Sequence, residues 1–135
     1  DHAMEERYGL IDGKDWRSRK VRHIDSDIAA NADGIFVAEI DQQVIGYITT
    51  RIDQETKVGG IPNLGVLPGY RGAGIGRQLI ETAVAYAKAA DMLYLRMETL
   101  AHNPIGQYLY PSCGFQEVAR QVHYVMPLAG EGVEK

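Results

Sequence analysis

Between residues 69 and 76 the chain carries four glycines in eight positions, and this segment separates two stretches of different hydrophobic period. Before it, the apolar run Ile61 to Leu67 predicts a strand with a weak or bulged centre at Gly65, ended by Pro68. After it, apolar residues recur at helical spacing from about Gly74 to Ala90. A glycine-rich turn that opens a helix presents bare backbone N–H groups. Such a turn favours binding of an anion, for example a pyrophosphate.

Two common nucleotide-binding fingerprints are excluded at this turn. The spacing of Gly72, Gly74 and Gly76 fails the pattern GxGxxG, because position 77 is an arginine. The segment also lacks the Gly-Lys-Ser/Thr ending of a Walker-type phosphate loop. Two readings remain: a tight strand-to-helix turn without a ligand, or an anion cradle flanked by Arg71 and Arg77.

The rest of the chain alternates helix and strand patterns, which predicts an α/β protein. A helix is expected over Asp15 to Ala30, and a hairpin over Ile35 to Ile40 and Val44 to Ile52, joined by Asp41-Gln42-Gln43. The strand expected over Leu93 to Thr99 should lie parallel to the one before the glycine-rich turn, because a helix connects them.

The C-terminal third predicts one more helix and one more strand region. Asn103 before Pro104 is a helix start signal, and Pro111 followed by Gly114 predicts a kinked or 3₁₀ last turn. Val118 to Leu128 alternates apolar and polar residues, which predicts one long or two short strands.

Composition narrows the class of protein. The chain has 135 residues with 45% apolar residues and a net charge of −4, which fits one globular domain over residues 1–135. A single cysteine and four scattered histidines predict neither disulfides nor a metal site. No apolar run reaches the ~20 residues of a membrane span, and no signal peptide is visible, so we expect a cytoplasmic protein. Mild acidity disfavours nucleic-acid binding, although a basic cluster lies between Lys14 and Arg22.

Two motifs resemble the GNAT family of N-acetyltransferases. Residues 71–76 read RGAGIG and match the family's R/Q-x-x-G-x-G/A signature, and the preceding VLPGY resembles its V-x-P-x-Y lead-in. A second segment is similar to the family's N-x-x-A-x-x-L-Y-x-x-x-G-F, with Gly106 in place of the alanine. Its matching positions are Asn103, Leu109, Tyr110, Gly114 and Phe115. The resemblance covers about Ile35 to Leu128.

The resemblance implies an acyl-coenzyme-A N-acyltransferase fold with a mixed sheet. Its central strands would splay apart to admit acetyl-coenzyme A, used as co-substrate without a metal. The pantetheine arm would pair with the backbone of a strand, and the pyrophosphate would lie on the glycine-rich turn. The implied coenzyme-binding residues are Leu64, Gly65, Val66, Arg71, Gly72, Ala73, Gly74, Ile75, Gly76, Arg77, Asn103 and Tyr110. Asn103 has the alternative role of a helix cap.

Acetyl transfer to an amine needs an acid for the leaving thiolate and a base for the incoming ammonium. Tyr110 matches the family's general acid; its alternative role is packing. Glu98 is our candidate base if it is partly desolvated, and is structural if it pairs with Arg96 or Arg51. Asn63 and Glu39 are weaker candidates for this role.

Several readings stay open at this point. Cys113 suggests either a covalent acetyl-cysteine route or, as we expect, a small buried thiol. The family's first strand has no convincing match before Asp15, so it is missing or atypical. The acceptor is a small-molecule amine or a protein amino group, and a homodimer is expected. The alternative to an enzyme is a non-catalytic acyl-coenzyme-A sensor or interaction domain.

Overall fold

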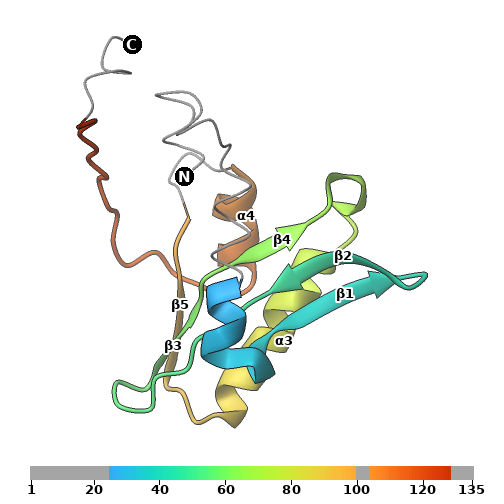
Figure 1. The fold of residues 1–135 in the computed structure, drawn as a ribbon, viewed down its shortest axis with the longest axis horizontal. Coiled ribbons are helices and arrows are strands. Elements are labelled where there is room, and N and C mark those ends of the chain that lie inside the picture. The colour runs from blue at the N-terminus through green and yellow to red at the C-terminus, as the bar shows by residue number, and fades with distance from the viewer. Residues whose placement is uncertain (1–24, 100–103, 129–135) are drawn as a thin grey trace.

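The computed structural model describes residues 25–99 and 104–128, which form two small sheets with helices packed against them (Figure 1). A helix described from residue 25 ends at Asn31, within one residue of the expected end. The first-strand question and the expected start of that helix lie outside the described residues. The elements that follow are η1 (Ala32–Gly34), β1 (Phe36–Ile40), β2 (Gln43–Ile48), β3 (Val58–Ile61), β4 (Leu64–Val66), η2 (Pro68–Tyr70), α3 (Ile75–Ala89), β5 (Tyr94–Met97) and α4 (Pro104–Ser112).

The predicted hairpin is confirmed as β1 and β2, paired antiparallel from Phe36↔Ile48 to Ile40↔Gln43. The turn consists of Asp41 and Gln42, both with positive φ (52° and 66°). Two residues with positive φ match the right-handed twist of a hairpin. β2 is shorter than predicted. It ends at Ile48, and beyond it the chain is hydrogen-bonded less regularly to the segment before β4.

The single strand predicted from Ile61 to Leu67 is wrong in one respect, because it divides at Pro62 and Asn63 into β3 and β4. Two residues, 49 and 50, lie between Ile48 and Arg51. Three residues, 61–63, lie between their pairing partners Leu64 and Gly60. One extra residue on one strand is a β-bulge, so the bulge lies at 61–63 rather than at Gly65.

Two sheets result from this division. One has the order β1-β2-β4, the other pairs β3 with β5, and the bridge between Arg51 and Gly60 joins them. β5 runs parallel to β3, which confirms the predicted parallel crossover through α3. β4 and β5 are not paired with each other, and Figure 1 shows them diverging.

α3 closes the core between these sheets. Its buried side chains recur at helical spacing and pack against Ile45 and Ile48 of β2 and Ile61 of β3. Ile80 and Ile48 have no exposed surface, so truncation of either to alanine would cost about 2–5 kcal/mol. The buried α3 residues are Ile75, Leu79, Ile80, Ala83 and Ala87.

α4 ends as the sequence predicts. It includes Pro111 and stops one residue later, and the N–H of Gly114 donates to the Pro111 carbonyl over 3.0 Å in a 3₁₀-type bond. Gly114 has φ 103°, and the N–H of Phe115 reaches back to the Tyr110 carbonyl at 3.1 Å. Gly114 thus forms a left-handed C-terminal cap, in which carbonyls of the last helical turn accept the hydrogen bonds that the helix itself does not supply.

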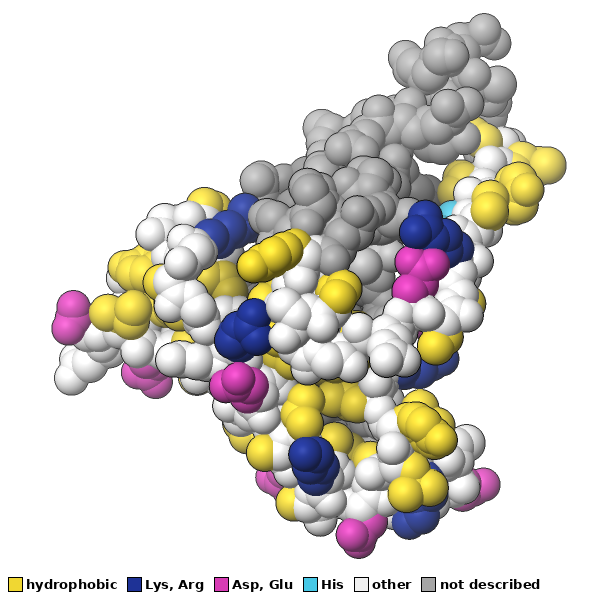
Figure 2. Space-filling view, turned by 180° about the vertical axis from the view of Figure 1, so that it is seen from behind, with side chains coloured by type: hydrophobic (Ala, Val, Ile, Leu, Met, Phe, Trp, Pro, Cys, Tyr) yellow, Lys and Arg dark blue, Asp and Glu magenta, His cyan; other side chains and the backbone are white. Residues whose placement is uncertain are grey.

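The strands predicted over Val118 to Leu128 are wrong. The structure has no strand there, and the segment runs extended and away from the sheets (Figure 1). Val118, Tyr124 and Leu128 are more than nine-tenths exposed, and Figure 2 shows hydrophobic side chains gathered on this segment. An alternating pattern defines two faces but supplies no edge to pair with, and none of the described strands pairs with this segment.

Candidate functional site

The glycine-rich turn leads directly into the N-terminus of α3. Gly72 and Gly74 have φ of 84° and 82°, a region that residues with a side chain rarely adopt. A Cβ built on either would meet nothing within 4 Å, so one side of the turn's backbone is open. Gly74 is the N-cap and provides no side-chain cap. The first N–H groups of a helix lack acceptors within it, so those of Ile75, Gly76 and Arg77 are available to an anion.

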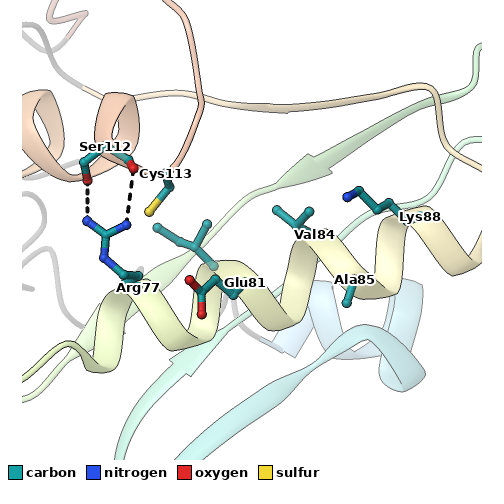
Figure 3. Close-up of a pocket in the computed structure, with 8 residues that line it drawn as sticks. Arg77, Glu81, Val84, Ala85, Lys88, Ser112 and Cys113 are labelled. Carbon is teal, nitrogen blue, oxygen red and sulfur yellow. Dashed lines mark hydrogen bonds between the residues drawn. The ribbon is translucent and has the colours of Figure 1, made fainter.

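The two arginines that flank the turn point to different places. Arg71 is exposed, and its Nε donates to the carbonyl oxygen of Val66 at 3.3 Å. Arg77 instead donates to the carbonyl and Oγ of Ser112, at 3.2 and 2.7 Å, and thereby joins α3 to α4 (Figure 3). Arg71 therefore has to give up only one exposed hydrogen bond to meet a phosphate, whereas the Arg77 guanidinium is held by two.

Among the described strands, β4 pairs only with β2, so its other edge has no strand partner. Thr49 N–H donates to Asn63 and Leu67 N–H donates to Ile45, at 2.9 and 2.8 Å. Alternate residues of an antiparallel strand point their backbone groups to opposite sides. The N–H and C=O of Leu64 and Val66 therefore face away from β2, on the side where β5 has diverged.

Gly65 has a packing role in place of the bulge expected there. It pairs with Tyr47 across the sheet, and a Cβ on the glycine would lie 2.5 Å from Tyr47 Cε1. Burial, and secondarily the negative charge of Asp27, raises the pKa of Tyr47. The Tyr47 ring therefore packs on Gly65, the middle residue of β4, in its neutral, protonated form.

Tyr110, the predicted general acid, lies on α4 close to the start of α3. Its neighbour Leu109 packs against Gly76, where an added Cβ would lie 3.3 Å from Leu109 Cδ2. Tyr110 is half-buried and makes an edge-to-face contact with Phe115, with 6.5 Å between ring centroids. Burial raises the pKa of Tyr110, so its proton is held at neutral pH.

The candidate bases are dispersed. Glu98 follows the end of β5 and is exposed, so the desolvation expected of a base is not found. Arg51 pairs with Asp27, which removes one of the structural partners we considered for Glu98. Glu39 is exposed on β1, at the opposite edge of its sheet from β4. Asn63 is buried, and its amide donates to Asp27. Asn103 lies outside the described residues.

Sequence reasoning missed the buried carboxylate of Asp27. The helix predicted over Asp15 to Ala30 includes this residue, but no role was assigned to it. Its spacing, three residues after Ile24, places it on the apolar side of the predicted helix. That spacing was the available signal.

A shallow hollow of about 370 Å³ lies on the outer side of α3, next to the end of α4 (Figure 3). Cys113 is half-buried there, with its sulfur directed toward α3, and no histidine is among the lining residues. The arrangement favours the packed thiol over the acetyl-cysteine route. The hollow is lined by Arg77, Ile80, Glu81, Val84, Ala85, Lys88, Ser112 and Cys113.

Within residues 25–99 and 104–128, no three His, Cys, Asp or Glu side chains lie close enough to hold a metal ion. In the same part of the chain, no helix combines the length and apolarity needed to cross a bilayer.

The arrangement of an open helix N-terminus beside a diverging strand edge agrees with a known family. Residues 2–115 match the model of the acetyltransferase (GNAT) family. The chain belongs to this family. Its GNAT fold is similar to that of aminoglycoside N-acetyltransferase AAC(6')-Iy, solved in complex with CoA, with a TM-score of 0.64 and 25% identity, over 83% of this chain and 90% of the other.

Two curated GNAT relatives come from archaea. An uncharacterized N-acetyltransferase of Archaeoglobus fulgidus is 38% identical over 90 residues, which cover 62% of this chain and 61% of the relative. An N-alpha-acetyltransferase of Sulfurisphaera tokodaii is 34% identical over 102 residues, which cover 66% of this chain and 60% of the relative. The chain thus spans about three fifths of the length of these relatives.

Proposed function

We propose that this protein transfers an acetyl group from acetyl-coenzyme A directly to a primary amine. The observation that carries the proposal is the open N-terminus of α3, set beside the unpaired edge of β4 in a member of the GNAT family. An anion site and an amide-pairing edge next to each other suit a ligand with phosphates at one end and an amide-containing arm at the other. Coenzyme A has this chemistry.

In the proposed complex the pyrophosphate accepts hydrogen bonds from the first N–H groups of α3, and Arg71 adds a positive charge. The turn residues Gly72, Ala73 and Gly74 let the phosphates approach the backbone, because nothing covers the two glycines. The arm runs along Leu64, Gly65 and Val66 like an added strand. The open backbone groups of Leu64 and Val66 would pair with its amides.

In the proposed reaction the acceptor nitrogen loses two protons and the sulfur gains one. The neutral amine attacks the thioester carbonyl, a C–N bond forms and the C–S bond breaks, and the sulfur leaves as a thiolate. Tyr110 then gives its proton to the thiolate, a role that suits a phenol whose pKa is raised by burial, and the phenolate regains a proton from the acylated nitrogen. Before the attack, the ammonium loses a proton to a base or to water.

Glu98 remains our candidate for that base. It directly follows Met97, the last residue of β5, which pairs with Ile61 where β3 ends. Glu98→Gln should remove the acidic limb of the rate profile, with coenzyme affinity unchanged. A profile identical to wild type would remove Glu98 from the candidate bases.

The acceptor is proposed only as a class. The similar proteins include one named for N-alpha-acetylation and one named for aminoglycosides, which favours an amino group on a protein terminus or on a polyamine-like small molecule. We further propose that residues 1–135 form one domain of a cytoplasmic protein that forms homodimers and binds neither nucleic acid nor membrane. The lone thiol of Cys113 fits a reducing compartment.

A thiol-release assay tests the function. Acetyl-coenzyme A is offered with panels of peptides, aminoglycosides, polyamines and amino acids, and the free thiol is measured. We expect release with at least one amine class and its loss in Tyr110→Phe. Tight coenzyme A binding without release for any amine would favour the acyl-coenzyme-A sensor instead. Absence of coenzyme A binding would refute both functions.

A further inference from the structure

A buried carboxylate from the helix ending at Asn31 lies where the strands separate. Asp27 is 3% exposed, and its oxygens accept hydrogen bonds from side chains of both sheet segments. Thr49 Oγ1 donates to it at 3.1 Å, Arg51 Nη2 at 2.6 Å, and Asn63 Nδ2 donates as well. A carboxylate withdrawn from water is stable only with such partners.

The three donors surround the bulge. Asn63 is one of the three residues on its longer side, and Thr49 lies opposite. The two residues are linked twice more, because Thr49 N–H donates to the Asn63 carbonyl at 2.9 Å and Asn63 N–H donates to Thr49 Oγ1 at 3.0 Å. Arg51 belongs to the bridge with Gly60 that joins the sheets. One carboxylate therefore holds both strands on either side of the extra residue.

We propose that Asp27 is a positioning residue for the coenzyme site. By holding Asn63, it fixes the backbone of the bulge. The bulge in turn sets the direction in which β4 diverges from β5. Leu64 follows Asn63 directly, so a rotation at the bulge moves the open backbone groups of Leu64 and Val66. This inference rests on the proposed function, because it assigns those groups to the coenzyme arm. Small displacements of such groups reduce binding steeply.

The same helix offers a matched control. Asn31 Nδ2 donates to Thr50 Oγ1 at 3.1 Å, and Thr50 Oγ1 donates to the Gly34 carbonyl at 2.8 Å. This cluster also joins the helix to the segment after β2, and Thr50 is fully buried. Within the described part of the chain, the Thr50 side chain is hydrogen-bonded to Asn31 and Gly34. Thr50 lies on the shorter side of the bulge, beside Thr49, and Thr50→Val therefore removes buried hydrogen bonds between the same elements without removing a contact of Asp27 or Asn63.

The experiment compares Asp27→Asn with Thr50→Val, both nearly isosteric. In Asp27→Asn an amide N–H₂ group replaces one acceptor oxygen. This donor then faces the N–H donors of Asn63 or Arg51, and the hydrogen bond at that position is lost. We expect coenzyme A, titrated by calorimetry, to bind at least tenfold more weakly to Asp27→Asn, and within twofold of wild type to Thr50→Val. Thermal melting checks that both variants are folded at the titration temperature.

A double-mutant cycle tests whether Asp27 acts through Asn63. Asn63→Ala should weaken coenzyme A binding on its own, and adding Asp27→Asn should weaken it little further. Full additivity would overturn the coupling. If Asp27→Asn does not fold, Asn63→Ala alone carries the test, and unchanged affinity in that variant would overturn the proposal.

The inference can fail separately from the proposed function. Hydrogen exchange of the backbone amides of residues 63–66, measured by NMR without any ligand, should accelerate in Asp27→Asn and stay as in wild type in Thr50→Val. Equal exchange in the two variants, or equal loss of coenzyme A affinity, would make Asp27 a merely stabilising group. If wild type binds no coenzyme A, the proposed function fails, and the exchange data alone decide whether Asp27 holds β4.

Discussion

The ring of Tyr47 lies against the backbone of Gly65, so closely that a Cβ on the glycine would stand 2.5 Å from Tyr47 Cε1 and 3.2 Å from the Tyr47 hydroxyl oxygen. The two residues are directly paired across β2 and β4. Any side chain at position 65 therefore has to displace an aromatic ring or bend the strand that we propose for coenzyme binding.

Gly65→Ala tests this contact. We expect a loss of about 1–3 kcal/mol in the free energy of unfolding, the usual cost of overpacking, together with weaker coenzyme A binding. Urea denaturation and calorimetry measure the two effects. In Tyr47→Ala/Gly65→Ala the space is restored, so the alanine at 65 should then cost much less. A single Gly65→Ala variant as stable as wild type would contradict the packing described here.

Arg71→Glu tests the proposed phosphate site. A negative charge beside the open N-terminus of α3 should weaken coenzyme A binding about 10-fold to 100-fold, which corresponds to about 1.4–2.8 kcal/mol. Because Arg71 is exposed, the unfolding free energy should change by less than about 0.5 kcal/mol. Arg120→Glu is the charge-matched control, since that exposed side chain pairs only with Glu117 among the described residues. Equal weakening by both variants would indicate a general charge effect.

Tyr110→Phe tests the acid. The rate of thiol release should fall by about 10²–10⁴, the range for loss of a general acid, while coenzyme A affinity is retained. Since burial holds the pKa of Tyr110 above its usual value of 10.0, the wild-type rate should decline only at more alkaline pH than that. In the phenylalanine variant this decline should be absent. A full rate in Tyr110→Phe would assign thiolate protonation to water.

Alkaline unfolding tests the environment of Tyr47. Its pKa is raised above 10.0 in the folded protein, first by burial and then by the charge of Asp27. The folded state therefore keeps a proton that the unfolded chain loses first, so stability is complete below pH 10 and falls as pH rises through the folded pKa. Urea denaturation at about pH 8 and about pH 11 should show a smaller decline for Tyr47→Phe than for wild type. Equal declines would mean that Tyr47 titrates as in water.

The sequence predicted those parts of the fold whose signals are local. The helix of α3 follows from the spacing of Leu79, Ile80 and Ala83, and the hairpin follows from two β-branched runs around a short turn. The glycine-rich turn was recognised because an open backbone before a helix has a definite chemistry. These features depend on neighbours within a few residues, so one sequence suffices to find them.

The features that were missed depend on distant partners. β3 contains Gly59 and Gly60, which have low strand propensity, yet it forms because β5 lies beside it. The residues from Val118 onward have the propensity but no described partner strand. Asp27 resembled an ordinary surface acid, since its burial follows from Thr49, Arg51 and Asn63, all more than twenty residues away.

The hydrogen bond from Arg71 to the Val66 carbonyl links the two halves of the proposed ligand site. An arm that pairs with Val66 has to displace the guanidinium, and the displaced guanidinium is then free to meet a phosphate. A fragment with only the diphosphate would not displace Arg71 from Val66. A fragment with only the amide chain would displace it but offer it no phosphate. Coenzyme A should accordingly bind more tightly than the product of the two fragment affinities suggests, a cooperativity that originates in one shared side chain.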